Sequence, residues 1–162
     1  MFEFIDFEAN GLDDNTYPIE VGFTLGEETY SFLIKPIAEW VDNRWDEYAE
    51  DFIHHISKDM LMVDGKDPLF IAQFLNDKLG SSVIYSDAWN YDMAWLNQLF
   101  DAASMKPTFK LKSINVLLAE LNISDEKFSD SLIELVDEDK AHRAGYDALM
   151  NKKAILNSIE NK

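Results

Sequence analysis

Four carboxylates and one histidine, spread over three short segments, are the side chains of this sequence best suited to chemistry. They are Asp6 and Glu8, then Asp92, and finally His142 and Asp147. Asp6 and Glu8 end an apolar run that predicts a buried strand, and side chains two positions apart on a strand lie on the same face. Two neighbouring carboxylates beside phenylalanines repel each other and resist desolvation. A divalent cation would remove both penalties, so the pair predicts a metal site.

The types of these side chains suit the hydrolysis of a phosphodiester bond. That reaction needs a hydroxide nucleophile, charge neutralisation at phosphorus and stabilisation of the leaving oxygen. Two Mg²⁺ or Mn²⁺ ions about 3.5–4 Å apart can supply all three. Such hard cations prefer oxygen ligands, which agrees with carboxylates rather than cysteine. A histidine, whose unperturbed pKa is about 6.5, suits proton abstraction near neutral pH.

The hydrophobic pattern predicts five strands. Residues 2–8, 17–25 and 29–34 are expected to form three consecutive antiparallel strands separated by polar turns. Residues 82–85 predict a short fourth strand, and residues 108–111 predict a weak fifth strand.

Helical patterns occupy most of the remaining chain. Residues 37–80 and 92–101 show helical spacing of apolar side chains, and so does the part after the last strand. That part is broken near 122–124 and 137–140, and its last helix is expected over about 142–159. The order of elements predicts a mixed α/β sheet with helices on both faces. Function in such sheets gathers at strand ends, so the three segments should converge at one edge.

The three segments resemble the motifs of the DEDDh family of 3′–5′ exonucleases, which have a ribonuclease H-like fold. The matching motifs are Asp6-Phe7-Glu8, the aromatic–Asp pair Tyr91-Asp92, and His142 followed five residues later by Asp147. The resemblance covers essentially the whole chain. It implies a mixed five-stranded sheet, a three-stranded antiparallel meander plus two further strands, flanked by helices. It also implies a single exonuclease domain over residues 1–162.

The resemblance assigns a role to each of the five side chains. Asp6 would bridge two divalent cations, Mg²⁺ or Mn²⁺, and Glu8 and Asp147 would hold the ion that carries the nucleophilic water. Asp92 would support the other ion through water, and His142 would be the general base. The implied substrates are 3′ ends of single-stranded DNA or RNA, or short oligonucleotides, with release of nucleoside 5′-monophosphates.

The resemblance also suggests substrate contacts just after the first motif. The backbone of Ala9 and Asn10 would bond the terminal 3′ hydroxyl, and Leu12 would wedge against the last base. Many relatives have Thr or Ser where this chain has Asn10, so that contact is expected to differ here.

Other aromatic and basic side chains have two interpretations. Trp40, Trp45 and Arg44 can stack on bases, since aromatic rings are sequence-tolerant platforms, although tryptophans are more often part of a core. A local basic cluster can contact phosphates or can simply be a solvated surface; it consists of Lys106, Lys110 and Lys112.

The spacing of the third motif restricts the position of His142. Five residues correspond to about 500° on a helix, so His142 and Asp147 would point apart if both were in regular helix. His142 should therefore lie in the loop or first turn before that helix. If it lay in the middle of the helix, its role as a base would be in doubt.

Simpler structural roles remain open for each motif residue. Asp6 and Glu8 can be solvent-facing residues of an edge strand, and Asp92 can be only a helix N-cap. Asp147 can be an ordinary exposed helix residue, and His142 a packing or capping residue. All of these would have to coincide with the motif order of one family.

Five further residues match less well. Asp87 lacks the aromatic neighbour of the second motif, so we set it aside. Asp13 and Asp14 are expected in a turn. The adjacent His54 and His55 face different directions and favour a structural role.

The charge of the chain restricts its partners. Acidic residues number 31 against 14 basic ones, for a formal net charge of −17. Proteins that grip long duplexes through many phosphates are normally basic, so strand ends or short oligomers are favoured here. The charge also supports a rival hypothesis, a non-catalytic acidic binding protein that mimics nucleic acid. A third hypothesis is an enzyme of the same fold that acts on a nucleotide or dinucleotide.

Composition indicates where such a protein would work. The absence of cysteine excludes disulfides and thiolate metal sites and is compatible with the cytoplasm. No apolar run approaches the about 20 residues that span a bilayer, and the N-terminus lacks the features of a secretory signal. We therefore expect a cytoplasmic protein without a membrane partner. A homodimer is plausible, as in some small relatives.

Overall fold

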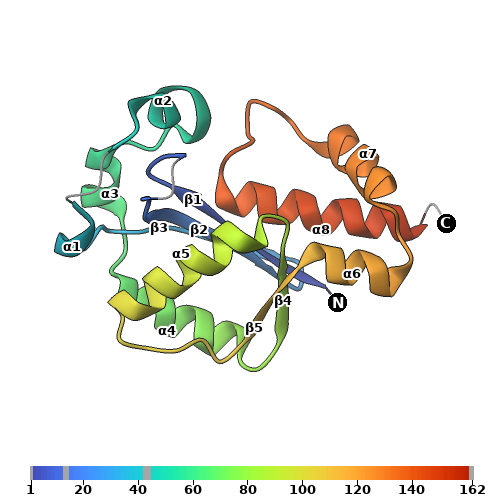
Figure 1. Cartoon of the computed structure of the whole chain (residues 1–162), viewed down its shortest axis with the longest axis horizontal. Coiled ribbons are helices and arrows are strands. Elements are labelled where there is room, and N and C mark those ends of the chain that lie inside the picture. Colours follow the sequence, from blue (N-terminus) through green and yellow to red (C-terminus); the bar gives the residue numbers. More distant parts are fainter. Residues whose placement is uncertain (1, 13–14, 42–44, 161–162) are drawn as a thin grey trace.

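A five-stranded sheet forms the centre of the molecule. The computed structural model describes residues 2–12, 15–41 and 45–160. The strand order is β3-β2-β1-β4-β5, with β1 and β2 and then β2 and β3 antiparallel, and β1, β4 and β5 parallel (Figure 1). The strands are β1 (Glu3–Ala9), β2 (Pro18–Leu25), β3 (Glu28–Leu33), β4 (Val83–Ser86) and β5 (Lys110–Ser113).

The helices follow the order expected from the sequence. They are α1 (Ala38–Val41), α2 (Glu47–Ala49), the π-helix η1 (Glu50–His54), α3 (Lys58–Asp64), α4 (Pro68–Leu79), α5 (Trp89–Ala102), α6 (Ile114–Leu121), α7 (Asp125–Leu135) and α8 (Ala144–Glu160). Local signals fix several boundaries. Asp67 caps α4 just before Pro68, and Ser124 caps α7 through the amide of Lys127.

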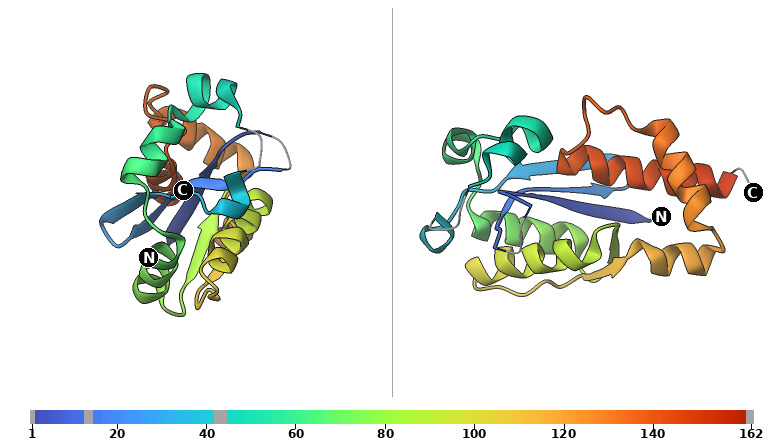
Figure 2. Two further views of the ribbon diagram at one scale, coloured as in Figure 1. Left: turned by 90° about the vertical axis from the view of Figure 1, so that its left-hand side faces the viewer. Right: turned by 45° about the horizontal axis from the view of Figure 1, so that its top comes forward.

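The alternation of side chains along β1 divides the interior into two cores. Ile5 and Phe7 are buried in the larger core, which includes residues of α4 and α5. Phe4 lies on the opposite face, in a second core with residues of α6, α7 and α8. Figure 2 shows α4 and α5 on one side of the sheet and α8 on the other. The predicted mixed sheet with helices on both faces is therefore confirmed.

The differences from the predicted elements are local. Helix α5 begins at Trp89, three residues before the expected start, and β5 lies two residues later than expected. The segment from Trp45 to Ile56 has helical spacing but forms only the short α2 and the π-helix. None of the helices in the described part of the chain is long and apolar enough to cross a lipid bilayer.

Candidate active site

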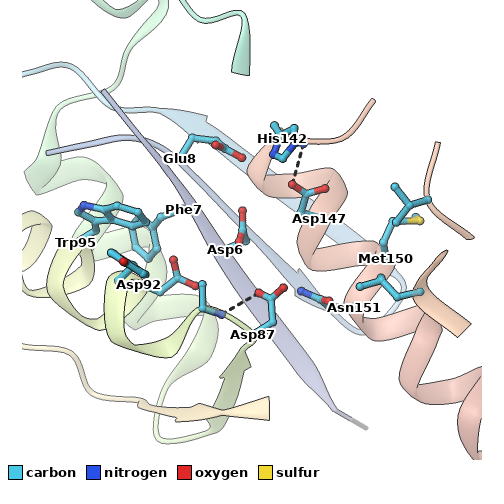
Figure 3. A pocket seen from close by; sticks show the side chains of 14 residues that line it. Asp6, Phe7, Glu8, Asp87, Asp92, Trp95, His142, Asp147, Met150 and Asn151 are labelled. Atoms are coloured by element: carbon cyan, nitrogen blue, oxygen red, sulfur yellow. Dashed lines mark hydrogen bonds between the residues drawn. The ribbon is translucent and has the colours of Figure 1, made fainter. Parts of the chain in front are cut away.

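The end of β1 carries the first two carboxylates. Asp6 and Glu8 lie on the face of β1 that is turned toward α8, as Figure 3 shows. Asp6 is only 9% exposed, and Glu8 is half-buried. Because β1 is the central strand and pairs with both β2 and β4, the edge-strand interpretation of this pair is wrong.

A glycine allows α8 to approach these carboxylates. Gly22 is the partner of Asp6 across the β1–β2 ladder. A Cβ atom on Gly22 would lie 2.1 Å from the backbone nitrogen of Gly145, so any side chain at this position would collide with α8. The first turn of α8 therefore lies directly on β2, and Asp147, two residues further on, faces the end of β1.

His142 lies in the loop before α8, as its spacing from Asp147 predicts. It precedes the helix by two residues and has a positive φ of 62°. Its backbone nitrogen donates a hydrogen bond of 2.9 Å to Oδ2 of Asp147. The amide of Asp147 in turn bonds the carbonyl oxygen of Arg143 at 3.0 Å. This double contact closes the loop onto the first turn of α8 and keeps the exposed imidazole beside Asp147.

A buried glutamate anchors the same loop to the sheet. Glu20, opposite Glu8 on β2, is 2% exposed. Its carboxylate accepts two hydrogen bonds from the guanidinium of Arg143, at 2.8 and 3.0 Å, and a third from the amide of Ala144 at 3.0 Å. Ser31 on β3 donates a fourth, at 2.9 Å. These contacts position the start of α8 and therefore also His142.

Asp92 reaches the site from α5. It lies in the first turn of that helix, and its own amide donates to the carbonyl oxygen of Ala88. The helix begins earlier, so the N-cap interpretation of Asp92 is wrong. The side chain is fully buried. Ser86 donates a hydrogen bond to Oδ2, whereas Oδ1 has no hydrogen-bond partner among the described residues.

Asp87, which matches the second motif less well than Asp92, lies in the same place. It occupies the turn between β4 and α5 and is exposed, and its Oδ1 accepts a hydrogen bond of 3.1 Å from the amide of Ala88. The second motif does not include Asp87, so the sequence pattern did not predict it as a site residue. The path of the chain after β4 brings it near Asp6. Figure 3 shows Asp87 beside Asp6, on the opposite side from His142.

The acidic side chains form two groups that can each hold a cation. In the first group, ligand atoms of Glu8, His142 and Asp147 lie within 4.8 Å of one another. The second group is formed in the same way by Asp6, Asp87 and Asp92. Five carboxylates and one imidazole match the preferences of Mg²⁺ or Mn²⁺. The unpartnered Oδ1 atom of Asp92 is the kind of buried acceptor that a cation would satisfy.

The carboxyl groups resist ionisation in the absence of a cation. Burial, followed by the charges of Asp92, Glu8 and Asp87, raises the pKa of Asp6 well above its usual value. Burial and then the charge of Asp147 raise the pKa of Glu8 to about 8.

The other two motif carboxylates behave in the same way. Burial raises the pKa of Asp92 to about 8, although the hydrogen bond from Ser86 opposes the change. Burial also raises the pKa of Asp147 to about 6, against the lowering effect of the His142 amide. Shifts of this kind, caused by burial and like charges in a cleft, are typical of functional sites.

These groups line a cavity of about 300 Å³. Its remaining walls are mostly apolar and come from α5, α7, α8 and the loop before α8. They include Tyr91, Trp95, Leu132, Val136 and Met150, together with Asn151, whose buried Oδ1 atom also has no hydrogen-bond partner within residues 2–12, 15–41 and 45–160. The cavity thus combines carboxylates on one side with surfaces that can contact an apolar or aromatic group on the other.

Solved structures share this arrangement of elements. Exonuclease I from E. coli, solved as a zinc-bound complex with single-stranded DNA, superposes with a TM-score of 0.71 and 15% identity. That match covers 98% of this chain and 39% of exonuclease I. Pop2p from S. pombe, in a form with bound Mg²⁺ and Mn²⁺, gives a TM-score of 0.67 and 16% identity. The match covers 96% of this chain and 81% of Pop2p.

The chain has a ribonuclease H-like fold. A thermophilic exonuclease I from Methylocaldum szegediense also matches, with a TM-score of 0.63, 12% identity and coverage of 98% of this chain and 39% of that one. The chain therefore spans about two fifths of the length of the exonuclease I proteins it resembles. No protein-family model matches it, and neither does any curated protein sequence.

The segment after the first motif is only partly available to a substrate. Asn10 is fully buried, and its side chain accepts a hydrogen bond of 2.7 Å from the amide of Tyr17. Its amide donates to Tyr17 and its carbonyl oxygen accepts from Asp46, so the expected contact of the Asn10 backbone with a 3′ hydroxyl is not supported. Ala9 is also buried, whereas Leu12 is 64% exposed; their substrate contacts stay predictions.

The two tryptophans considered as base platforms have other partners. Trp40 is buried and stacks on Tyr17, so it belongs to the core. Trp45 is half-buried, donates a hydrogen bond to Glu50 and lies under the ammonium of Lys58. Neither lines the cavity of the five carboxylates.

His54 and the lysines of the basic cluster do not line this cavity. His54 is buried, accepts a hydrogen bond from the amide of Ile56 and has a pKa lowered to about 4 by burial, in agreement with a structural role. The lysines of the basic cluster lie in the loop before β5 and on β5 itself, where the choice between phosphate contact and solvated surface stays open. Arg44, Asp13 and Asp14 lie outside the described residues.

Proposed function

We propose that the protein is a metal-dependent 3′–5′ exonuclease that hydrolyses phosphodiester bonds and releases nucleoside 5′-monophosphates. The observation that carries the proposal is the convergence of two ligand groups at the C-terminal end of the central strand of a ribonuclease H-like sheet. Each group includes a buried or half-buried carboxylate whose ionisation is unfavourable without a cation. Exonuclease I with single-stranded DNA and Pop2p with Mg²⁺ and Mn²⁺ share the fold, which supports this choice.

The proposed cofactor is a pair of divalent cations, Mg²⁺ or Mn²⁺. Glu8 and Asp147 would hold one ion and Asp92 the other. Asp6 belongs to the group of Asp92, and as the neighbour of Glu8 on the same face of β1 it would contact both ions. When bound, the two ions would neutralise the charge on the phosphate and stabilise the leaving oxygen. The four carboxylates come from β1, α5 and α8, and their backbone positions are fixed by the sheet and by helix packing.

His142 is the proposed general base. Its imidazole is exposed at the mouth of the cavity, where it can take a proton from an attacking water molecule. The hydrogen bond between its backbone and Asp147 holds the backbone of His142 beside that carboxylate. Because ligand atoms of Glu8 and Asp147 lie within 4.8 Å of the ring, a second role as a metal ligand has to be distinguished by experiment.

The proposed substrate is a 3′ end of single-stranded DNA or RNA, or a short oligonucleotide. A net charge of −17 opposes a long contact with a polyanion, so recognition should be confined to the cavity and the residues around it. Leu12 is exposed enough to press against a terminal base, and Tyr91 on the cavity wall is 57% exposed. Base stacking of this kind tolerates any sequence.

The first test is an exonuclease assay with 5′-labelled single-stranded DNA and RNA of several lengths. We expect a ladder of 3′-shortened products with Mn²⁺ or Mg²⁺, no products with EDTA, and none from the Asp6→Asn variant. The matched control is Asp77→Asn, an exposed carboxylate on α4 outside the cavity, which should behave like the wild type. Absence of shortening by folded wild-type protein with metal would reject the proposal.

The acidic composition supports one competing function, a non-catalytic nucleic-acid mimic. A mimic would bind a basic partner with or without Mg²⁺, whereas the exonuclease needs the ion for each turnover. Preference for a dinucleotide over longer strands would instead favour the third hypothesis, a nucleotide-directed enzyme of this fold. A homodimer and a cytoplasmic location also stay predictions, which sedimentation analysis and cell fractionation would test.

A further inference from the structure

Asp87 is an additional carboxylate beside the proposed metal site. It is no part of the three motifs, yet one of its oxygen atoms lies within 4.8 Å of an oxygen of Asp6 and of Asp92. We propose that Asp87 is a direct ligand, together with Asp6 and Asp92, of one of the two cations. This ion would then be held by three protein carboxylates even before nucleic acid binds. The inference rests on the proposed function, because it concerns the same site.

The state of Asp92 is the independent observation that indicates a ligand here. Its side chain is fully buried, and Ser86 holds only Oδ2. The other oxygen, Oδ1, is buried and has no hydrogen-bond partner in the described part of the chain, although Asp92 lines the cavity. A buried acceptor without a partner destabilises a fold unless something binds it. A cation between Asp92 and Asp87 would supply that partner.

The backbone brings Asp87 close enough for this role. It directly follows the last residue of β4, and the amide of Ala88 donates a hydrogen bond to Oδ1 that limits rotation of the carboxylate. Mg²⁺ binds oxygen octahedrally at about 2.0–2.1 Å, so adjacent ligands are about 3 Å apart and opposite ligands about 4 Å apart. The observed separation of at most 4.8 Å therefore closes with a shift of under about 1 Å per side chain.

The extra carboxylate changes the charge balance of the site. Two divalent cations balance the charges of the four motif carboxylates, which are Asp6, Glu8, Asp92 and Asp147. Asp87 adds one more negative charge. An additional anionic ligand strengthens cation binding, so the ion held by Asp6, Asp87 and Asp92 should bind more weakly when Asp87 is removed.

A purely local role for Asp87 makes a different prediction. Its bond to the Ala88 amide is typical of a turn residue, and a turn residue would have no effect on metal affinity. The distinguishing experiment is a titration of full-length, metal-free protein with Mn²⁺ in the absence of nucleic acid. Isothermal titration calorimetry and the electron paramagnetic resonance signal of free Mn²⁺ would measure binding during this titration.

We expect two Mn²⁺ ions per wild-type chain. Asp87→Asn should weaken one of the two sites about 10- to 100-fold, as loss of a metal-site partner commonly does, and leave the other within about twofold. Asp87→Glu, which retains a carboxylate, should bind within a few fold of the wild type, and Asp77→Asn should be unchanged. Circular dichroism would establish that each variant is folded.

The outcomes separate the two proposals. Equal Mn²⁺ affinities for wild type and folded Asp87→Asn would overturn the inference and leave the proposed function intact. Equal weakening by Asp87→Asn and Asp77→Asn would also overturn it, because the effect would then be one of overall charge. If the folded wild type bound no Mn²⁺, the proposed metal site itself would fail.

Discussion

Glu20 and Arg143 connect strand β2 to the loop of the proposed general base through a paired contact. Nη2 of Arg143 lies 2.8 Å from Oε1 of Glu20, and Nε lies 3.0 Å from Oε2. The carboxylate is buried, whereas the side chain of Arg143 is 45% exposed. Because Arg143 directly follows His142, this contact helps to position the backbone that carries the imidazole.

Loss of this contact should affect turnover more than substrate affinity. We expect Glu20→Gln to lower kcat on the order of 10- to 100-fold with KM within about twofold, because a displacement of about 1 Å can cost that much. Arg143→Lys keeps the charge but loses the paired geometry, so it should show a smaller fall in the same direction. Steady-state kinetics on a labelled oligonucleotide would measure both. A lower melting temperature with unchanged kcat would show that the contact is only structural.

Gly22 allows the third motif to meet the first. A methyl group at this position would lie 2.1 Å from the backbone of Gly145, and backbone cannot move aside as a flexible side chain can. We expect Gly22→Ala to destabilise the fold by about 1–3 kcal/mol, as overpacking commonly does, and to lower kcat by displacing Asp147. Urea unfolding and the exonuclease assay would measure the two effects.

Gly145→Ala is the matched comparison. Its added methyl would meet the Cβ of Ser31 at 3.0 Å, a side-chain contact rather than a backbone one. It should therefore destabilise the protein less than Gly22→Ala. The opposite order would contradict the proposed reason for the glycine at position 22.

Much of this arrangement could be predicted from the sequence because it depends on short periodic patterns. The alternation in β1 separates Asp6 and Glu8 from Ile5 and Phe7, and the structure keeps that separation. The five-residue spacing in the third motif placed His142 before the helix, where it lies. Both conclusions needed only the geometry of one strand or one helix.

The parts that were missed depend on contacts between segments that are distant in sequence. The place of Asp87 depends on the path of the chain after β4, and its sequence neighbours do not reveal that path. The burial of Asn10 results from its bonds to Tyr17 and Asp46. The π-helix after Ala49 shows the same limit, since helical spacing does not distinguish hydrogen-bonding to the fourth from the fifth residue.

Metal binding by His142 can be distinguished from its proposed role as a general base. If His142 is the general base, His142→Ala should lower kcat by about 10²- to 10⁴-fold and leave Mn²⁺ affinity within about twofold. If the ring binds a cation beside Glu8 and Asp147, Mn²⁺ affinity should fall together with kcat. The control is His55→Ala, which removes an exposed imidazole outside the cavity and should change neither quantity.

A buried ion pair should stabilise the packing of α8 on the sheet without taking part in catalysis. Nζ of Lys152 lies 2.8 Å from Oε2 of Glu3, and both side chains are nearly inaccessible. Lys152→Met leaves a buried carboxylate without its partner, so we expect a loss of about 3–5 kcal/mol in the free energy of unfolding. The double variant Glu3→Gln, Lys152→Met should regain part of it in urea unfolding. No recovery would show that Lys152 stabilises mainly by another contact, such as its bond to the carbonyl oxygen of Gly26.

The raised pKa values of the buried carboxyl groups make metal-free stability depend on pH. Glu8 and Asp92 have pKa values of about 8 in the folded state, against about 4 in an unfolded chain. The folded state therefore holds these protons more tightly, and its stability should fall as pH rises from about 4 to about 8. Melting curves in EDTA should show this decline, and Mn²⁺ should raise the melting temperature most at the alkaline end. Asp92→Asn cannot ionise at this position, so its decline should be shallower. An equal decline in wild type and Asp92→Asn would assign the pH dependence to other groups.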